Sequence, residues 1–134
     1  MIGIVIVAHG GLAREYLAAI EHVVGHQAGI EAIAIEEGHD RSAKQDQICA
    51  AADAVDTGDG VVIVTDMFGG SPSNLSLRAC EPENRRILYG ANLPMLIKLA
   101  KSRNATVPEA VARALEAGRK YIDTIEIGGD QGVS

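Results

Sequence analysis

Four short runs of apolar residues are spaced along the chain, separated by longer stretches in which polar and apolar positions mix. The runs at 2–8 (IGIVIVA) and 60–66 (GVVIVTD) are rich in Val and Ile, whereas those at 30–35 and 85–90 are less uniform. Unbroken β-branched runs of this length are typical of strands that are buried on both faces of a parallel sheet. The pattern therefore predicts four strands.

The stretches between these runs repeat apolar residues every three to four positions, which is the period of an amphipathic helix. Asp40 is a candidate N-cap for one helix, and Ser71 with Pro72 marks the start of another. A Thr-x-x-Glu capping box opens the last helix at 106–109, after a further helix that begins near Asn92. The apolar stripes of the first two helices are Leu12, Tyr16, Leu17, Ile20, Val23 and Val24 in one, and Ile48, Ala51, Ala52 and Val55 in the other.

Alternating strands and helices predict an α/β fold. We expect a four-stranded, mainly parallel sheet in the order 2-1-3-4, flanked by helices, in a single domain over residues 1–128. Residues 124–127 (TIEI) have the pattern of a further strand but follow no tight turn, so we expect this strand to pair across a subunit boundary. The Gly-rich residues 129–134 are expected to form a flexible tail.

The charge of the chain limits its partners. The 134 residues carry 18 acidic and 12 basic side chains, a formal net charge of −6. Since the sequence also has no long basic run, it predicts no nucleic-acid partner. We expect the more closely spaced basic residues to lie on solvated surfaces: Arg85, Arg86, Lys98, Lys101 and Arg103.

No feature of the sequence predicts a membrane segment, a metal or a cofactor. The N-terminus lacks a basic segment with a cleavage site, and no apolar run approaches the ~20 residues of a membrane helix, so we expect a cytoplasmic protein that is not membrane-embedded. Cys49 and Cys80 lack the spacing of metal ligands. The glycine motifs of nucleotide-binding loops are absent from the sequence.

Two titratable residues end two of the predicted strands. His9 follows the first apolar run, and Asp66 closes the third. In the order 2-1-3-4 these strands are neighbours, and open parallel sheets bind ligands at the carboxyl ends of the strands where the order reverses. Each residue is followed by glycines, and Gly70 leads directly to Ser71 at a predicted helix start, where backbone N–H groups favour an anion. Gly10, which follows His9, allows the backbone to turn tightly and to approach an anion in the same way as Gly70.

This combination predicts a histidine nucleophile. A carboxylate that accepts from one ring nitrogen leaves the lone pair of the other nitrogen available to attack, and donors for phosphate nearby indicate phosphorus as the electrophile. A serine hydrolase built on Ser71, His9 and Asp66 is a weaker alternative, because Pro72 has no N–H for an oxyanion hole. A third interpretation is a small-molecule binding module in which His9 is structural.

Three ordered motifs carry a family resemblance: IVIVAHG near the N-terminus, DMFGGSPSN in the centre and GANLPML at 90–96. Together they resemble the mannose-family enzyme IIA domain of the bacterial phosphoenolpyruvate-dependent sugar phosphotransferase system, over essentially the whole chain. The resemblance implies a phosphocarrier in which His9 accepts a phosphoryl group from the histidine-containing phosphocarrier protein and passes it to a IIB partner. Asp66 would orient the ring, with Ser71 lining the site.

The resemblance also implies a homodimer that exchanges a C-terminal strand, which would accommodate residues 124–127. Some family members continue into a IIB domain after an Ala/Pro-rich linker, and this sequence shows neither, so the IIB partner is expected to be a separate protein. The alternative is a stand-alone regulator whose histidine phosphorylation state controls another protein. The motifs look nearer to the sugar-transport branch than to the branch that serves dihydroxyacetone kinase.

Overall fold

A computed structural model describes residues 1–67 and 84–128 of the chain. The helix predicted to start at Ser71 lies outside these residues, as does the tail at 129–134. The described elements alternate between strands and helices along most of the chain, as the apolar pattern predicts. They are β1 (Gly3–His9), α1 (Leu12–Val24), β2 (Ile30–Ile35), α2 (Arg41–Val55), β3 (Val61–Thr65), β4 (Arg85–Leu88), α4 (Leu93–Lys101) and α5 (Val107–Lys120).

The four strands form one sheet in the order β2-β1-β3-β4, and all three pairings are parallel. The predicted order is therefore confirmed. In the register of β1 against its neighbours, His9 lies opposite Ile35 of β2, and Val7 lies opposite Thr65, the last residue of β3. The carboxyl ends of β1 and β3 consequently meet at one edge of the sheet.

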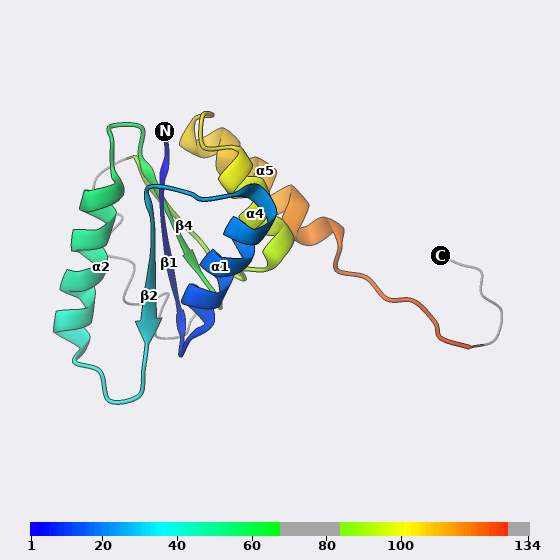
Figure 1. The fold of residues 1–134 in the computed structure, drawn as a ribbon, viewed down its shortest axis with the longest axis horizontal. Coiled ribbons are helices and arrows are strands. Elements are labelled where there is room, and N and C mark those ends of the chain that lie inside the picture. Colours follow the sequence, from blue (N-terminus) through cyan, green and yellow to red (C-terminus); the bar gives the residue numbers. More distant parts are fainter. Residues whose placement is uncertain (68–83, 129–134) are drawn as a thin grey trace.

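Helices cover both faces of the sheet: α2 lies on one face, and α1, α4 and α5 lie on the other (Figure 1). Alternate residues of β1 point to opposite faces. Ile4 and Ile6 belong to the cluster under α1 and α4, whereas Val5 and Val7 belong to the cluster under α2. Because β1 is buried on both faces, the uninterrupted apolar run at 2–8 is what its environment requires.

The predicted helix starts at Asp40, Asn92 and Thr106 are confirmed by their capping contacts. The Asp40 side chain accepts hydrogen bonds from the first backbone N–H groups of α2, and Thr106 and Glu109 form the reciprocal capping box of α5. Asn92 caps α4 by accepting from the Met95 N–H and also donates to the Gly118 carbonyl oxygen at 2.8 Å. Asn92 thereby joins α4 to α5.

Two arginines are buried, so the expectation that Arg85 and Arg103 lie on solvated surfaces is wrong. Arg85 forms ion pairs with Asp53 at 2.8 Å and Asp56 at 3.2 Å on the α2 side. Arg103, which is 4% exposed, donates to backbone carbonyl oxygens instead of a carboxylate. Each side chain finds partners far away in the sequence, so no local pattern indicates its burial. The other three residues of this expectation are exposed, as predicted: Arg86, Lys98 and Lys101.

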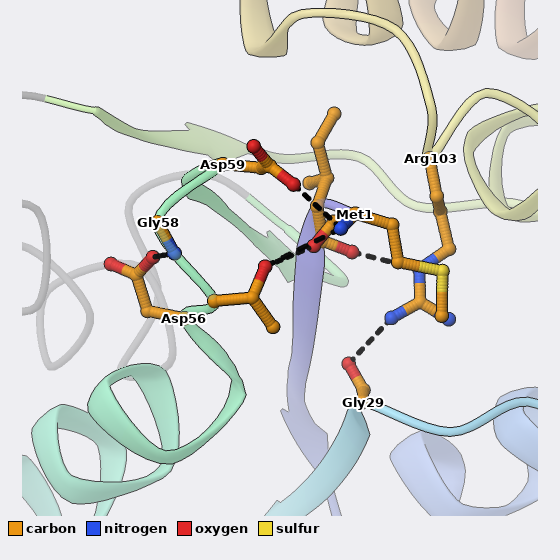
Figure 2. A network of polar contacts seen from close by, with 8 residues as sticks. Met1, Gly29, Asp56, Gly58, Asp59 and Arg103 are labelled. Atoms are coloured by element: carbon orange, nitrogen blue, oxygen red, sulfur yellow. Dashed lines mark hydrogen bonds and ion pairs between the residues drawn. The ribbon is translucent and has the colours of Figure 1, made fainter.

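Arg103 joins three segments at the amino end of the sheet. Its Nε donates to the Ile2 carbonyl oxygen at 2.8 Å, and its two Nη atoms donate to those of Ala28 at 2.6 Å and Gly29 at 3.0 Å. Figure 2 shows Arg103 reaching Gly29 beside the network in which the Met1 amine contacts Asp59. Burial lowers the pKa of Arg103. The network lies at the end of β1 opposite to His9.

After α5 the chain leaves the body of the protein as an extended arm, residues 121–128 (Figure 1). Residues 124–127, where a strand is expected, pair with no strand among the described residues of the same chain. The side chains of the arm are unusually exposed for apolar residues: Ile122 is 74% exposed, Ile125 76% and Ile127 97%.

Candidate functional site

His9 is the last residue of β1 and the only one of that strand that is exposed. Half of its side-chain surface is accessible to solvent, whereas the six preceding residues of the strand are buried. The chain then turns at Gly10 and enters α1 within three residues (Figure 1). A rigid buried strand thus holds the imidazole at the carboxyl edge of the sheet, where a partner molecule can reach it.

Asp66 follows the last residue of β3 and contacts His9 twice. One oxygen, Oδ2, accepts from the His9 backbone N–H at 3.1 Å and lies 2.9 Å from ring Nδ1. A carboxylate can only accept, so the proton is on Nδ1, and the Nε2 lone pair of the neutral ring is available. The predicted meeting of these two residues, 57 positions apart in the sequence, is confirmed.

The other oxygen of Asp66, Oδ1, is buried and has no hydrogen-bond partner among the described residues. The whole side chain is 12% exposed. Buried carboxylate oxygens are normally hydrogen-bonded. Among the described residues, the position of Asp66 depends on His9 and on the backbone at the end of β3.

Tyr16 lies beside the His9–Asp66 pair. The sequence pattern places this tyrosine only on the apolar face of a helix. Its hydroxyl donates to the Ala91 carbonyl oxygen at 3.2 Å, and the Ala91 N–H donates to the Thr65 carbonyl oxygen at 3.1 Å. Burial raises the pKa of Tyr16, and the nearby charge of Asp66 raises it further. Nothing in the sequence indicated this contact, because it joins residues 75 positions apart.

Gly10 has a left-handed backbone conformation (φ 56°), which permits the tight turn from β1 into α1. Its N–H donates to the Ile35 carbonyl oxygen at 2.9 Å, so that amide extends the sheet bonding. The following helix α1 begins at Leu12 without a side-chain cap. The first N–H groups of a helix have no partner within the helix, and here they face the same edge as His9.

Two predicted site residues, Gly70 and Ser71, lie outside the described residues, so their place in the site stays a prediction. His39, in the loop after β2, is partly buried, and its Nδ1 donates to the Glu36 carbonyl oxygen at 2.6 Å. None of the helices within 1–67 and 84–128 has the length and apolar character to cross a bilayer.

Comparisons of the sequence and of the fold connect this chain with known proteins. A family model for EIIA-man, the phosphotransferase system (PTS) fructose IIA component, matches residues 3–115. The mannose-specific EIIAB component of the PTS from Escherichia coli (strain K12) is 30% identical over 128 residues, which are 93% of this chain and 40% of that protein. The chain therefore spans about two fifths of that relative's length.

Solved structures of IIA proteins share the fold. The phosphotransferase system component EIIA from Streptococcus agalactiae is 26% identical with a TM-score of 0.83, over 92% of this chain and 97% of that one. The mannose/sorbose-specific IIA subunit from Enterococcus faecalis is 25% identical with a TM-score of 0.83, over 97% and 98% of the two chains. Because the family model covers most of the sequence, the protein belongs to the EIIA-man family of IIA components of the sugar phosphotransferase system.

Proposed function

We propose that the protein is a phosphocarrier in which His9 Nε2 accepts and releases a phosphoryl group. The observation that carries this proposal is the 2.9 Å contact between His9 Nδ1 and Asp66 Oδ2, which holds the ring in the tautomer with a nucleophilic Nε2. As Nε2 bonds to phosphorus, the bond from phosphorus to the donor's ring nitrogen breaks, and its electron pair returns to that nitrogen. The Nδ1 proton stays on His9, bonded to Asp66.

The phosphoryl oxygens need donors at the same edge of the sheet. The uncapped N-terminus of α1 supplies backbone N–H groups and the positive end of a helix dipole next to His9. Gly10 shapes this turn. We assign Gly70 and the Ser71 hydroxyl to the same role of binding the phosphoryl oxygens, following the resemblance of the segment that contains them. This arrangement stabilises the transferring group with preorganised dipoles and calls for no metal or cofactor.

The partners follow from the family. We propose that the donor is the histidine-containing phosphocarrier protein and that the acceptor is a IIB component, in the cytoplasm, during sugar uptake. This chain matches 40% of the length of the E. coli relative, which is a mannose-specific EIIAB component. That relative supports a IIB acceptor for this chain.

The proposal is tested by the intact mass of the purified protein after incubation with phosphoenolpyruvate, enzyme I and the histidine-containing phosphocarrier protein. We expect the gain of one phosphoryl group, lost again in acid, as is typical of a phosphoramidate. Adding a IIB component should return the protein to its original mass. If the mass stays unchanged with a cognate donor, His9 is a structural residue and the carrier function is wrong.

The substitution Asp66→Asn tests the role of the carboxylate. The asparagine side chain is nearly the same size, and its carbonyl oxygen can still accept from the His9 backbone N–H and from Nδ1–H. It lacks the negative charge that stabilises the positive charge developing on the ring as Nε2 bonds to phosphorus. We expect transfer of the phosphoryl group to His9 to slow by a factor on the order of 100, the scale of effect seen when one preorganised electrostatic contact to a reacting group is removed. Rapid-quench measurement of phosphorylation checks this, with the exposed Asp46→Asn as the control that should transfer at the normal rate.

We further propose that the extended arm mediates a homodimer by adding a strand to β4 of a second copy. The arm leaves Ile125 76% and Ile127 97% exposed, and such apolar side chains are stabilised by burial. In the described sheet β4 is one of the two terminal strands, and an unpaired edge is a template for pairing. Ile87 of β4 and Ile122 line the same hollow, which places the start of the arm beside this strand.

The double substitution Ile125→Asp with Ile127→Asp is expected to convert a dimer to a monomer, since it removes the apolar face of the added strand. Glu126 lies between them and points to the other face in an extended chain, so Glu126→Gln should leave the dimer intact. Light scattering coupled to size exclusion measures the mass of each variant. A monomeric wild type, or a double variant that remains dimeric, would contradict this role of the arm.

A further inference from the structure

The phenol group of Tyr16 occupies a junction between three segments that form the site. Tyr16 lies on α1, the helix that starts directly after His9. Its hydroxyl donates to the carbonyl oxygen of Ala91, in the segment between β4 and α4. The N–H of the same Ala91 donates to the carbonyl oxygen of Thr65, which precedes Asp66. Tyr16 is therefore connected to the end of β3 through a single residue.

The environment of Tyr16 keeps its hydroxyl in the donor form. The ring is partly buried and packs against the core cluster under α1 and α4. Burial raises the pKa of the phenol, and the negative charge of Asp66 does so as well. The hydroxyl therefore stays protonated in neutral solution and keeps its bond to the Ala91 carbonyl oxygen.

Asp66 depends on such support because its carboxylate is bonded on one side. Oδ2 accepts both bonds from His9, and the buried Oδ1 has no partner among the described residues. Among the described residues, the Asp66 side chain is therefore positioned by His9 and by the backbone that carries it. That backbone follows Thr65, whose carbonyl oxygen is bonded by Ala91.

We propose that Tyr16 is a positioning residue for the His9–Asp66 pair: its hydroxyl holds Ala91, and Ala91 holds the end of β3 where Asp66 begins. This inference rests on the proposed phosphocarrier function for its consequence on rate. Its effect on the His9 ring does not depend on that function. The hydroxyl acts at a distance from the transferring group, so its contribution is to geometry.

The substitution Tyr16→Phe removes the hydroxyl and retains the ring. We expect the share of neutral His9 in the Nδ1–H tautomer, measured from the ¹⁵N shifts of the imidazole, to fall. We also expect the rate of phosphoryl transfer from the phosphocarrier protein to fall about three- to tenfold, the scale of one lost hydrogen bond. Thermal unfolding of the variant is measured in parallel to establish that it is folded.

Tyr121→Phe is the matched control, because it removes the same hydroxyl from a tyrosine that is 65% exposed on the arm side of α5. This variant should keep both the tautomer and the rate of the wild type. If Tyr16→Phe lowers only the unfolding temperature and leaves the tautomer unchanged, Tyr16 is structural and the inference is wrong. If the wild type accepts no phosphoryl group but Tyr16→Phe still shifts the tautomer, the carrier function fails and the positioning role stands.

Discussion

Replacing His9 with Gln is expected to abolish phosphoryl acceptance completely. The Gln side chain can still donate to Asp66 through its amide, but an amide nitrogen has no lone pair that can attack phosphorus. Because His9 is half exposed at the end of β1, the substitution leaves the buried part of the strand unchanged. Intact mass after incubation with the complete donor system should show no added phosphoryl group.

The matched control is His39→Gln. His39 lies in the loop after β2, whose carboxyl end is at the same edge of the sheet, but its Nδ1 bonds to a backbone carbonyl oxygen instead of a carboxylate. This variant should be phosphorylated like the wild type. Phosphorylation of His9→Gln at the wild-type level would contradict the assignment of His9, and loss of labelling in His39→Gln alone would transfer the role to that residue.

Replacing Arg103 with Met is expected to destabilise the fold by about 3 kcal/mol, a large part of the roughly 5–15 kcal/mol typical of a domain. The loss comes mainly from the carbonyl oxygens of Ile2 and Ala28, which lose the donors that Arg103 supplies in a buried setting. The carbonyl oxygen of Gly29 keeps its bond from the Ile4 N–H. Met fills similar volume without any donor. Urea unfolding followed by circular dichroism measures the change in the free energy of unfolding.

Arg103→Lys separates charge from geometry, because an ammonium keeps the charge but cannot reproduce the fork that reaches three carbonyl oxygens. We expect the free energy of unfolding of Arg103→Lys to lie between those of the wild type and Arg103→Met. The exposed Arg113→Met is the control and should change the free energy of unfolding by less than about 0.5 kcal/mol. An Arg103→Met variant as stable as the wild type would show that water can replace the guanidinium. The folded variant should transfer at the normal rate, since Arg103 lies at the opposite end of the sheet from His9.

Much of the fold was predictable because its signals are local or periodic. The run at 2–8 is apolar throughout because β1 is covered on both faces, and the side chains of Asp40 and Thr106 cap the helices that they begin. The meeting of His9 and Asp66 also followed from the sequence, because each ends a strand and the common strand order makes those strands neighbours. Residue type and strand order together were sufficient to predict that contact.

Other features depend on the tertiary structure. Arg85 and Arg103 look like ordinary surface cations in the sequence, but the fold supplies their acceptors from residues 29 to 101 positions away. Tyr16 likewise looks like part of an apolar stripe until the segment at Ala91 is packed against its hydroxyl. The sequence by itself determined most of the described elements and the pairing of His9 with Asp66, since these follow from local periodicity and strand ends. Only the tertiary structure decided which polar atoms satisfy each other in the interior, because that depends on distances between segments that local sequence does not encode.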